Sequence, residues 1–127
     1  MKQEEKLHGS ICDYLKIQYP KVFFISEQSG LRVSIGLRAK LKRTRSNHTH
    51  LDLYILHPSK DESKHGLVLE LKAKPVKKKN GELFKSEHLA EQQDTINKLN
   101  KLGYVASFAT SFQEAKTLID NYLNGKI

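Results

Sequence analysis

The chain has 127 residues, the size of one ordinary domain. Hydrophobic residues make up 38% of it, and no run approaches the roughly 18 apolar positions that a membrane-spanning helix needs. Lysine and arginine number 22 against 14 aspartates and glutamates, which gives a formal net charge of +8. Such an excess of positive charge favours an anionic partner, with nucleic acid ahead of a membrane surface.

The cysteine content and the first residues bear on the compartment. Cys12 is the single cysteine, which excludes an internal disulfide and a four-thiolate zinc site. Residues 1–10 contain no apolar core of the kind a secretory signal has. We therefore expect a cytoplasmic protein that folds as a single domain over residues 1–127.

The first third of the chain predicts a helix, a strand and a basic segment. Apolar residues recur with helical spacing over 4–19, and Pro20 ends the pattern. Residues 22–26 are rich in β-forming side chains and predict a short buried strand. The segment 28–51 has no acidic residue, and a helix around 36–43 is one option for it.

The remaining two-thirds predict alternating strands and helices. In chain order these are strands over 51–56 and 66–72, a helix from the N-cap Ser86 to Leu102, a strand over 104–109 and a last helix after Ser111. The fold class that this order predicts is α/β: a small mixed β-sheet flanked by helices on both faces.

Charged side chains interrupt both central strands. Val68, Glu70 and Lys72 share one face of their strand, where two helical layers would require apolar residues. Asp52 is the only charge in the strand 51–56. If the two strands pair as a hairpin, Asp52 and Glu70 converge, and they would repel unless a divalent cation such as Mg²⁺ lay between them. The alternatives are a strand that emerges into solvent at Glu70 and a turn residue at Asp52.

Two helices carry polar residues within their apolar stripes. Gln92 lies in the stripe of Leu89, Ile96 and Leu99, and Glu4 extends the stripe of the first helix. Gln92 could instead be a semi-buried amide with its hydrogen bonds satisfied. Glu4 could instead be a favourable charge in the first turn of a helix.

Two basic segments, 32–45 and 72–79, contain no carboxylate. This pattern predicts contacts with a phosphate backbone, although a solvated surface is the alternative. The candidate DNA-binding residues are Arg32, Arg38, Lys40, Lys42, Arg43, Arg45, Lys74, Lys77, Lys78 and Lys79.

Asp52, Glu70-x-Lys72 and the helical Gln92, in this order and spacing, resemble the PD-(D/E)XK nuclease superfamily. The sequence is most similar to the virus-type replication-repair (VRR-NUC) branch, especially its small stand-alone phage and bacterial forms. The likeness runs over most of the chain, from the Glu4 helix to Gln92, eleven residues before Gly103. One departure is local: that branch usually has a glycine or proline shortly before its aspartate, and here His50-Leu51 precede it.

The resemblance implies a restriction-endonuclease-like core and a metal-dependent endodeoxyribonuclease that uses Mg²⁺, with Mn²⁺ as a substitute. Asp52, Glu70 and the backbone carbonyl of Leu71 would ligate the metal. Lys72 would orient or deprotonate the attacking water, or bind a phosphate oxygen. Gln92 would position Lys72 or the substrate.

Glu4 would complete the metal shell, directly or through a water molecule. The resemblance further implies a structure-selective enzyme for branched DNA, such as Holliday junctions or flaps, in DNA repair, recombination or replication. It leaves a homodimer possible. The alternative reading is a non-catalytic basic nucleic-acid-binding module whose carboxylates are structural, and charge alone would also suit an RNA-processing or ribosome-associated protein.

Overall fold

The computed structural model describes residues 3–27, 34–44 and 49–126. Over these ranges the elements are α1 (Gln3–Gln18), β1 (Phe24–Ser26), α2 (Ile35–Thr44), β2 (Leu53–Ile55), β3 (Leu67–Leu71), α3 (Glu87–Lys101), β4 (Val105–Ala109) and α4 (Phe112–Leu123). Every helix and strand expected from the sequence is therefore present. The helix around 36–43, which was one option for the basic segment, is α2. In the ranges described, no helix is both long and apolar enough to cross a membrane.

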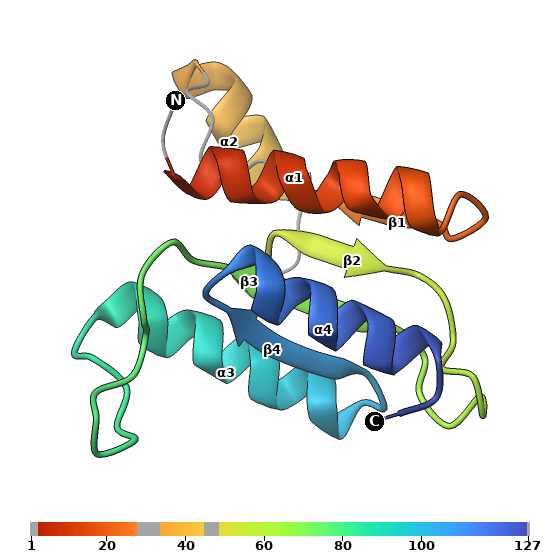
Figure 1. Cartoon of the computed structure of the whole chain (residues 1–127). Helices are drawn as coiled ribbons and strands as arrows, with labels where there is room; N and C mark the ends of the chain where they lie inside the picture. Colours follow the sequence, from red (N-terminus) through yellow and green to blue (C-terminus); the bar gives the residue numbers. More distant parts are fainter. Residues whose placement is uncertain (1–2, 28–33, 45–48, 127) are drawn as a thin grey trace.

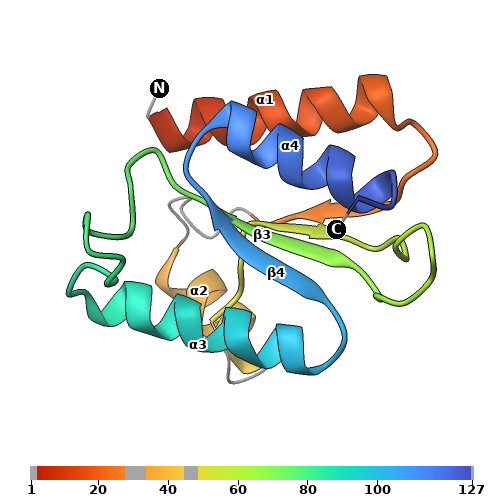
Figure 2. The same ribbon diagram turned by 60° about the horizontal axis from the view of Figure 1, so that its bottom comes forward.

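The strands form one mixed sheet in the order β1-β2-β3-β4. β1, β2 and β3 pair antiparallel, and β3 pairs parallel with β4. Helices α1 and α4 cover one face of this sheet, and α3 covers the other (Figures 1 and 2). The predicted fold class, a small mixed sheet with helices on both faces, is confirmed.

The alternation of side chains along β3 divides the core into two layers. Leu67, Leu69 and Leu71 belong to the core beneath α1 and α4. Val68 belongs to the core beneath α3, where it packs with Ile96. Glu70, between these positions in the same strand, therefore points toward α3.

The expectation of a buried strand over 22–26 is wrong in one respect. β1 lies at the edge of the sheet, where it pairs with β2. Phe23 is 65% exposed and Ile25 is 45% exposed. α3 packs chiefly against β4, at the opposite edge, so this helix does not cover β1 as α1 covers the other face.

Both C-terminal helices begin at the serine caps expected from the sequence. Ser86 Oγ accepts a hydrogen bond from the backbone N–H of Leu89 (3.2 Å), and Ser111 Oγ accepts one from Glu114 (3.0 Å). Gly103, directly after α3, has φ of 95°, and a Cβ there would lie 2.7 Å from the His65 ring. Any other residue at this turn from α3 into β4 would be strained and would displace the His65 ring.

Candidate active site

Asp52 and Glu70 face each other across β2 and β3. The register pairs Leu53 with Leu69, so Asp52, one residue before β2, lies opposite Glu70. The backbone N–H of Leu71 donates a hydrogen bond to Asp52 Oδ2 (2.9 Å) and fixes this carboxylate at the end of the strand. The two carboxyl groups lie close enough to hydrogen-bond to each other when one of them is protonated. The convergence expected from the sequence is thus confirmed.

Glu70 is held by side chains from β3 and α3. It is 4% exposed, and its Oε2 accepts a hydrogen bond from Gln92 Nε2 (2.7 Å). Lys72 Nζ lies 3.4 Å from the same oxygen. Gln92, in the apolar stripe of α3, is 3% exposed and is a buried amide directed at a carboxylate. The structure therefore brings four of the predicted residues together: Asp52, Glu70, Lys72 and Gln92.

Two oxygen atoms in this cluster have no hydrogen-bond donor among the residues that the structure describes. These atoms are Glu70 Oε1 and Gln92 Oε1, and both are buried. Buried oxygens of this kind are rare, because leaving one unsatisfied costs about 1–3 kcal/mol. A hard divalent cation prefers oxygen ligands, and one or two carboxylates plus waters suffice to hold Mg²⁺. The donor set of Asp52 and Glu70 therefore fits a Mg²⁺ or Mn²⁺ ion.

The electrostatics of the pair also favour a bound positive charge. Burial is the largest cause that raises the pKa of Glu70 to about 8, and the charge of the Asp52 carboxylate is the second. The positive charge of Lys72 lowers this pKa and offsets part of the shift. Burial also raises the pKa of Asp52, although the Leu71 N–H and the nearby cations oppose this shift. Without a cation the pair would thus hold a proton near neutral pH, and a cation bound between the carboxylates would displace it.

Glu4 is separate from this cluster in the structure. It lies in the first turn of α1 and is exposed. Among the residues that the structure describes, no group of three or more His, Cys, Asp or Glu side chains is arranged to hold a metal. The two carboxylates would therefore need waters, a backbone oxygen or the substrate to complete a metal shell, and the role of Glu4 stays a prediction.

Two histidines belong to the surroundings of the site and were missed from the sequence. His88 Nε2 lies 3.1 Å from Gln92 Nε2, at the start of α3. His8 Nε2 is hydrogen-bonded to Ser26 Oγ (2.5 Å) and contributes to the electrostatic potential at Asp52. Helical spacing could have revealed both, since His88 lies four residues before Gln92 and His8 four residues after Glu4.

The structure shows the predicted DNA-binding residues only in part. Arg32 and Arg45 lie outside the described residues, and for Arg38 and Lys42 only the backbone is described. The remaining six are all exposed: Lys40 and Arg43 on α2, and Lys74, Lys77, Lys78 and Lys79 in the loop between β3 and α3. This loop leaves β3 directly after Lys72, so its cations are close in sequence to the carboxylate pair.

Solved structures similar to this one include a "VRR_NUC domain protein". The two chains superpose with a TM-score of 0.68 at 22% sequence identity, over 98% of this chain and 90% of the other. No model of a known protein family matches the sequence, and neither does any curated protein. The fold is thus of the VRR-NUC, restriction-endonuclease-like type, and the resemblance inferred from Asp52, Glu70 and Lys72 is confirmed in the fold.

Replacing Gln92 with alanine should lower any metal-dependent cleavage about 10- to 100-fold, the usual cost of losing a side chain that orients a metal ligand. Gln93, the next residue, bonds to Asn97 Oδ1 (2.9 Å) on the exposed side of α3 and serves as the matched control. Single-turnover cleavage rates of Gln92→Ala and Gln93→Ala, with thermal unfolding of both, would measure the difference. Equal rates for the two variants would remove Gln92 from the site.

Proposed function

We propose that this protein is a Mg²⁺-dependent endonuclease that hydrolyses phosphodiester bonds in DNA. The observation that carries the proposal is the buried Glu70 carboxylate, which contacts Lys72 and Gln92 and shares a strand end with Asp52. A chain of charge +8 has little structural reason to bury the Glu70 carboxylate next to the half-buried Asp52 and an unsatisfied amide oxygen. Binding of a divalent cation and a DNA phosphate supplies that reason.

Each residue of the cluster has a distinct task in this proposal. A bound Mg²⁺ would lower the pKa of an attacking water and neutralise charge that develops on the phosphate. The Leu71 N–H favours the ionised form of Asp52 and fixes its orientation, and the Gln92 amide holds Glu70. The Lys72 ammonium lies beside Glu70 Oε2. From this position Lys72 can bind a non-bridging phosphate oxygen or orient the attacking water.

The DNA would reach the carboxylates along exposed cations. Lys74 to Lys79 follow Lys72 in the chain, and α2 presents Lys40 and Arg43 on its exposed surface. These side chains suit contacts with the phosphate backbone, which fix position without reading base sequence. We expect selection of DNA by its structure, with branched forms such as Holliday junctions or flaps preferred, as a repair, recombination or replication enzyme requires.

The experiment that tests the proposal is cleavage of a set of end-labelled DNAs: a four-way junction, a flap, a duplex and a single strand. Each is incubated with Mg²⁺, with Mn²⁺ and with EDTA. We expect cleavage with either metal and none with EDTA, at higher rates on the branched forms. Binding without cleavage of any DNA in either metal would contradict the proposal and would identify a non-catalytic DNA-binding module.

Replacing Lys77 and Lys78 together with alanine should weaken binding to all DNA sequences alike. The salt dependence should also become shallower, because each lost phosphate contact reduces the slope of log K against log salt by about 0.9 on duplex DNA. Lys21 and Lys60 are exposed, and they belong to the segments between α1 and β1 and between β2 and β3. These two segments lie at the other end of the sheet from the loop between β3 and α3 (Figure 1), so the double alanine variant is the control. Fluorescence anisotropy over a salt series gives both slopes. Identical slopes in the two variants would show that the 72–79 loop does not contact DNA.

A homodimer would place two carboxylate pairs on one branched DNA. Resolution of a four-way junction needs two symmetric cuts, and a two-fold dimer is the simplest way to provide them. Light scattering at micromolar concentration should then report about twice the 14.6 kDa chain mass. A chain that stays monomeric on a junction would instead favour single cuts in flaps or single strands.

A further inference from the structure

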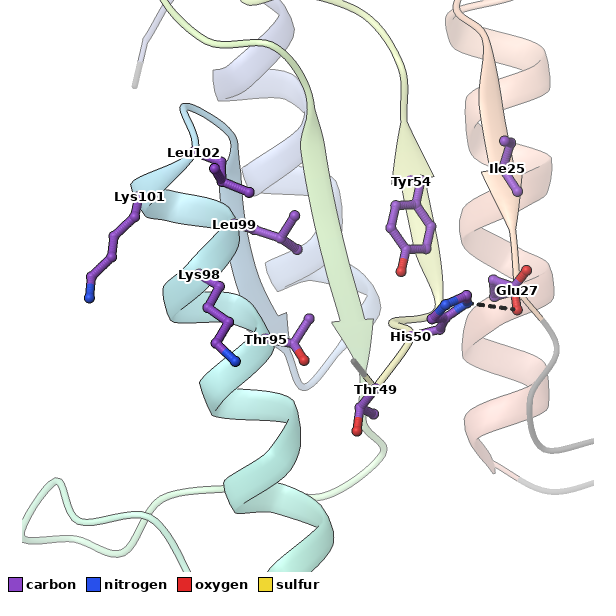
Figure 3. A pocket seen from close by; sticks show the side chains of 10 residues that line it. All are labelled: Ile25, Glu27, Thr49, His50, Tyr54, Thr95, Lys98, Leu99, Lys101 and Leu102. Carbon is purple, nitrogen blue, oxygen red and sulfur yellow. Dashed lines mark ion pairs between the residues drawn. The ribbon is translucent and has the colours of Figure 1, made fainter. Parts of the chain in front are cut away.

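An open cavity of about 630 Å³ lies on the α3 side of the sheet. Its walls come from the second half of α3 on one side, and from β1, β2 and residues 49–50 on the other (Figure 3). It occupies the part of the sheet face that α3 leaves uncovered. None of the four residues of the candidate active site lines it.

The walls of the cavity are mainly apolar and include one aromatic ring. Ile25 and Tyr54 project from the strands, and Leu99 and Leu102 from α3 and its C-cap (Figure 3). Ile25 is 45% exposed and Leu102 is 66% exposed, so both present apolar surface to a ligand. Aromatic and aliphatic surfaces of this kind accept the flat face of a nucleobase whatever its identity.

Polar groups stand at two parts of the rim. Lys98 and Lys101 lie in the last turn of α3, and Lys98 Nζ contacts Asp94 Oδ2 at 2.9 Å. On the side of β1, His50 Nδ1 lies 3.9 Å from Glu27 Oε2. The two lysines suit a phosphate group, and the imidazole of His50 can donate to or accept from the polar edge of a base.

Residues on both walls of the cavity lie close in sequence to residues of the candidate active site. His50 lines it and lies two residues before Asp52, and the Tyr54 hydroxyl accepts a hydrogen bond from the Leu51 N–H (3.0 Å). On α3, Lys98 and Lys101 lie six and nine residues beyond Gln92, which is about 9–14 Å along the helix. That span corresponds to roughly three or four base steps of DNA at about 3.4 Å each.

We infer that this cavity binds an unpaired nucleobase of the DNA strand cut at Asp52 and Glu70, while Lys98 and Lys101 bind a neighbouring phosphate. The inference rests on the proposed function and names its substrate class: DNA with at least one unpaired nucleotide a few positions from the cut. A fully paired duplex keeps its bases stacked inside the helix and cannot fill the cavity. Branched DNA has unpaired or easily unpaired bases at the branch.

A second copy of the chain suits this cavity less well than a nucleotide does. A two-fold contact centred on the cavity would bring together two chains that each carry a net charge of +8, with Lys98 and Lys101 on the rim of each cavity. Like charges brought together oppose association, whereas a phosphate group attracts the same lysines. The charge of the rim therefore favours a nucleic acid over a copy of this protein.

The test compares two duplexes in EDTA, where the proposed cleavage cannot occur. One is fully paired, and the other carries a single extrahelical 2-aminopurine, whose fluorescence falls when it stacks on an aromatic ring. We expect the wild-type protein to bind the bulged duplex at least about fivefold more tightly and to quench the probe, since stacking one base supplies at least that factor. Equal affinity for the two duplexes would overturn the inference whatever any variant does.

Leu102→Asp, with a carboxylate at the mouth of the cavity, should abolish the preference for the bulged duplex and leave the affinity for the paired duplex nearly unchanged. Ile17→Asp is the control, because Ile17 is an apolar residue of α1 that is 76% exposed on the other side of the sheet. Lys98→Ala with Lys101→Ala should weaken bulge binding without a change of fold. A preference that survives in Leu102→Asp would place the unpaired base elsewhere.

Two further outcomes separate the possible failures. If light scattering shows a wild-type dimer that Leu102→Asp converts to monomers, the cavity is an interface between copies and the inference is wrong. If the bulge preference is observed but no DNA is cut with Mg²⁺, the inference about the cavity is supported and the proposed nuclease activity is wrong. If DNA is cut but the preference is absent, the activity stands and the inference about the cavity fails.

Discussion

Replacing Glu70 with glutamine is expected to abolish cleavage, with a loss of at least about 10³-fold, while DNA binding stays at wild-type strength or becomes tighter. The amide has nearly the same shape, so packing under α3 is retained, but it cannot supply the negative charge that a divalent cation requires. The removal of that charge also removes repulsion of the DNA phosphates, which explains the expected gain in affinity. Single-turnover cleavage and anisotropy measure the two effects.

Asp13→Asn is the control for this change, because it neutralises an exposed carboxylate on α1. It should cleave at the wild-type rate. Full activity in Glu70→Gln would refute the assignment of the site, whatever the fold. A parallel loss of cleavage and of thermal stability would instead indicate that the variant fails to fold, and Gln92→Ala would then be the decisive comparison.

The free energy of unfolding of the metal-free protein is expected to fall by a few kcal/mol as the pH rises from about 5 to about 8. The pKa of Glu70 is raised from 4.5 to about 8 in the folded state, first by burial and then by Asp52. Between these two values the folded protein holds a proton that the unfolded chain has released, so a rise in pH favours unfolding. The stabilisation by this proton is complete below the unfolded pKa and is lost as the pH passes the folded one.

Urea unfolding at several pH values, for the wild type and for Glu70→Gln, measures this effect. The difference between the two proteins isolates the contribution of Glu70 from that of all other groups. Glu70→Gln should be the more stable protein at pH 8, and millimolar Mg²⁺ should raise the stability of the wild type there by replacing the proton. Parallel pH curves for the two proteins would show that Glu70 has an ordinary pKa.

The sequence predicted most of the fold because its local signals agree with the tertiary structure. The serines that cap α3 and α4 stand where the first-turn pattern requires them, and the alternation in β3 assigns Leu69 and Glu70 to opposite faces. The position of β1 at the edge of the sheet could not be predicted, because strand order depends on pairing between distant segments. Ile25 therefore looked buried and is not.

Most of the candidate site, like most of the fold, could be predicted from the sequence. Charged or amide side chains at positions that should be apolar identified four site residues: Asp52, Glu70, Lys72 and Gln92. The structure brings these four together. Glu4 follows from the same argument, but it is exposed. The cavity had no sequence signal, because it depends on how far α3 extends over one face of the sheet.

The most direct test of the central claim is the location of a bound metal. Crystals grown above pH 8, where Glu70 has lost its proton, are soaked in Mn²⁺, and an anomalous difference map is calculated. We expect a peak in contact with the Asp52 and Glu70 carboxylates, and none in crystals of Glu70→Gln. A well-ordered map with no peak between these two carboxylates, or the same peak in the variant, would contradict it.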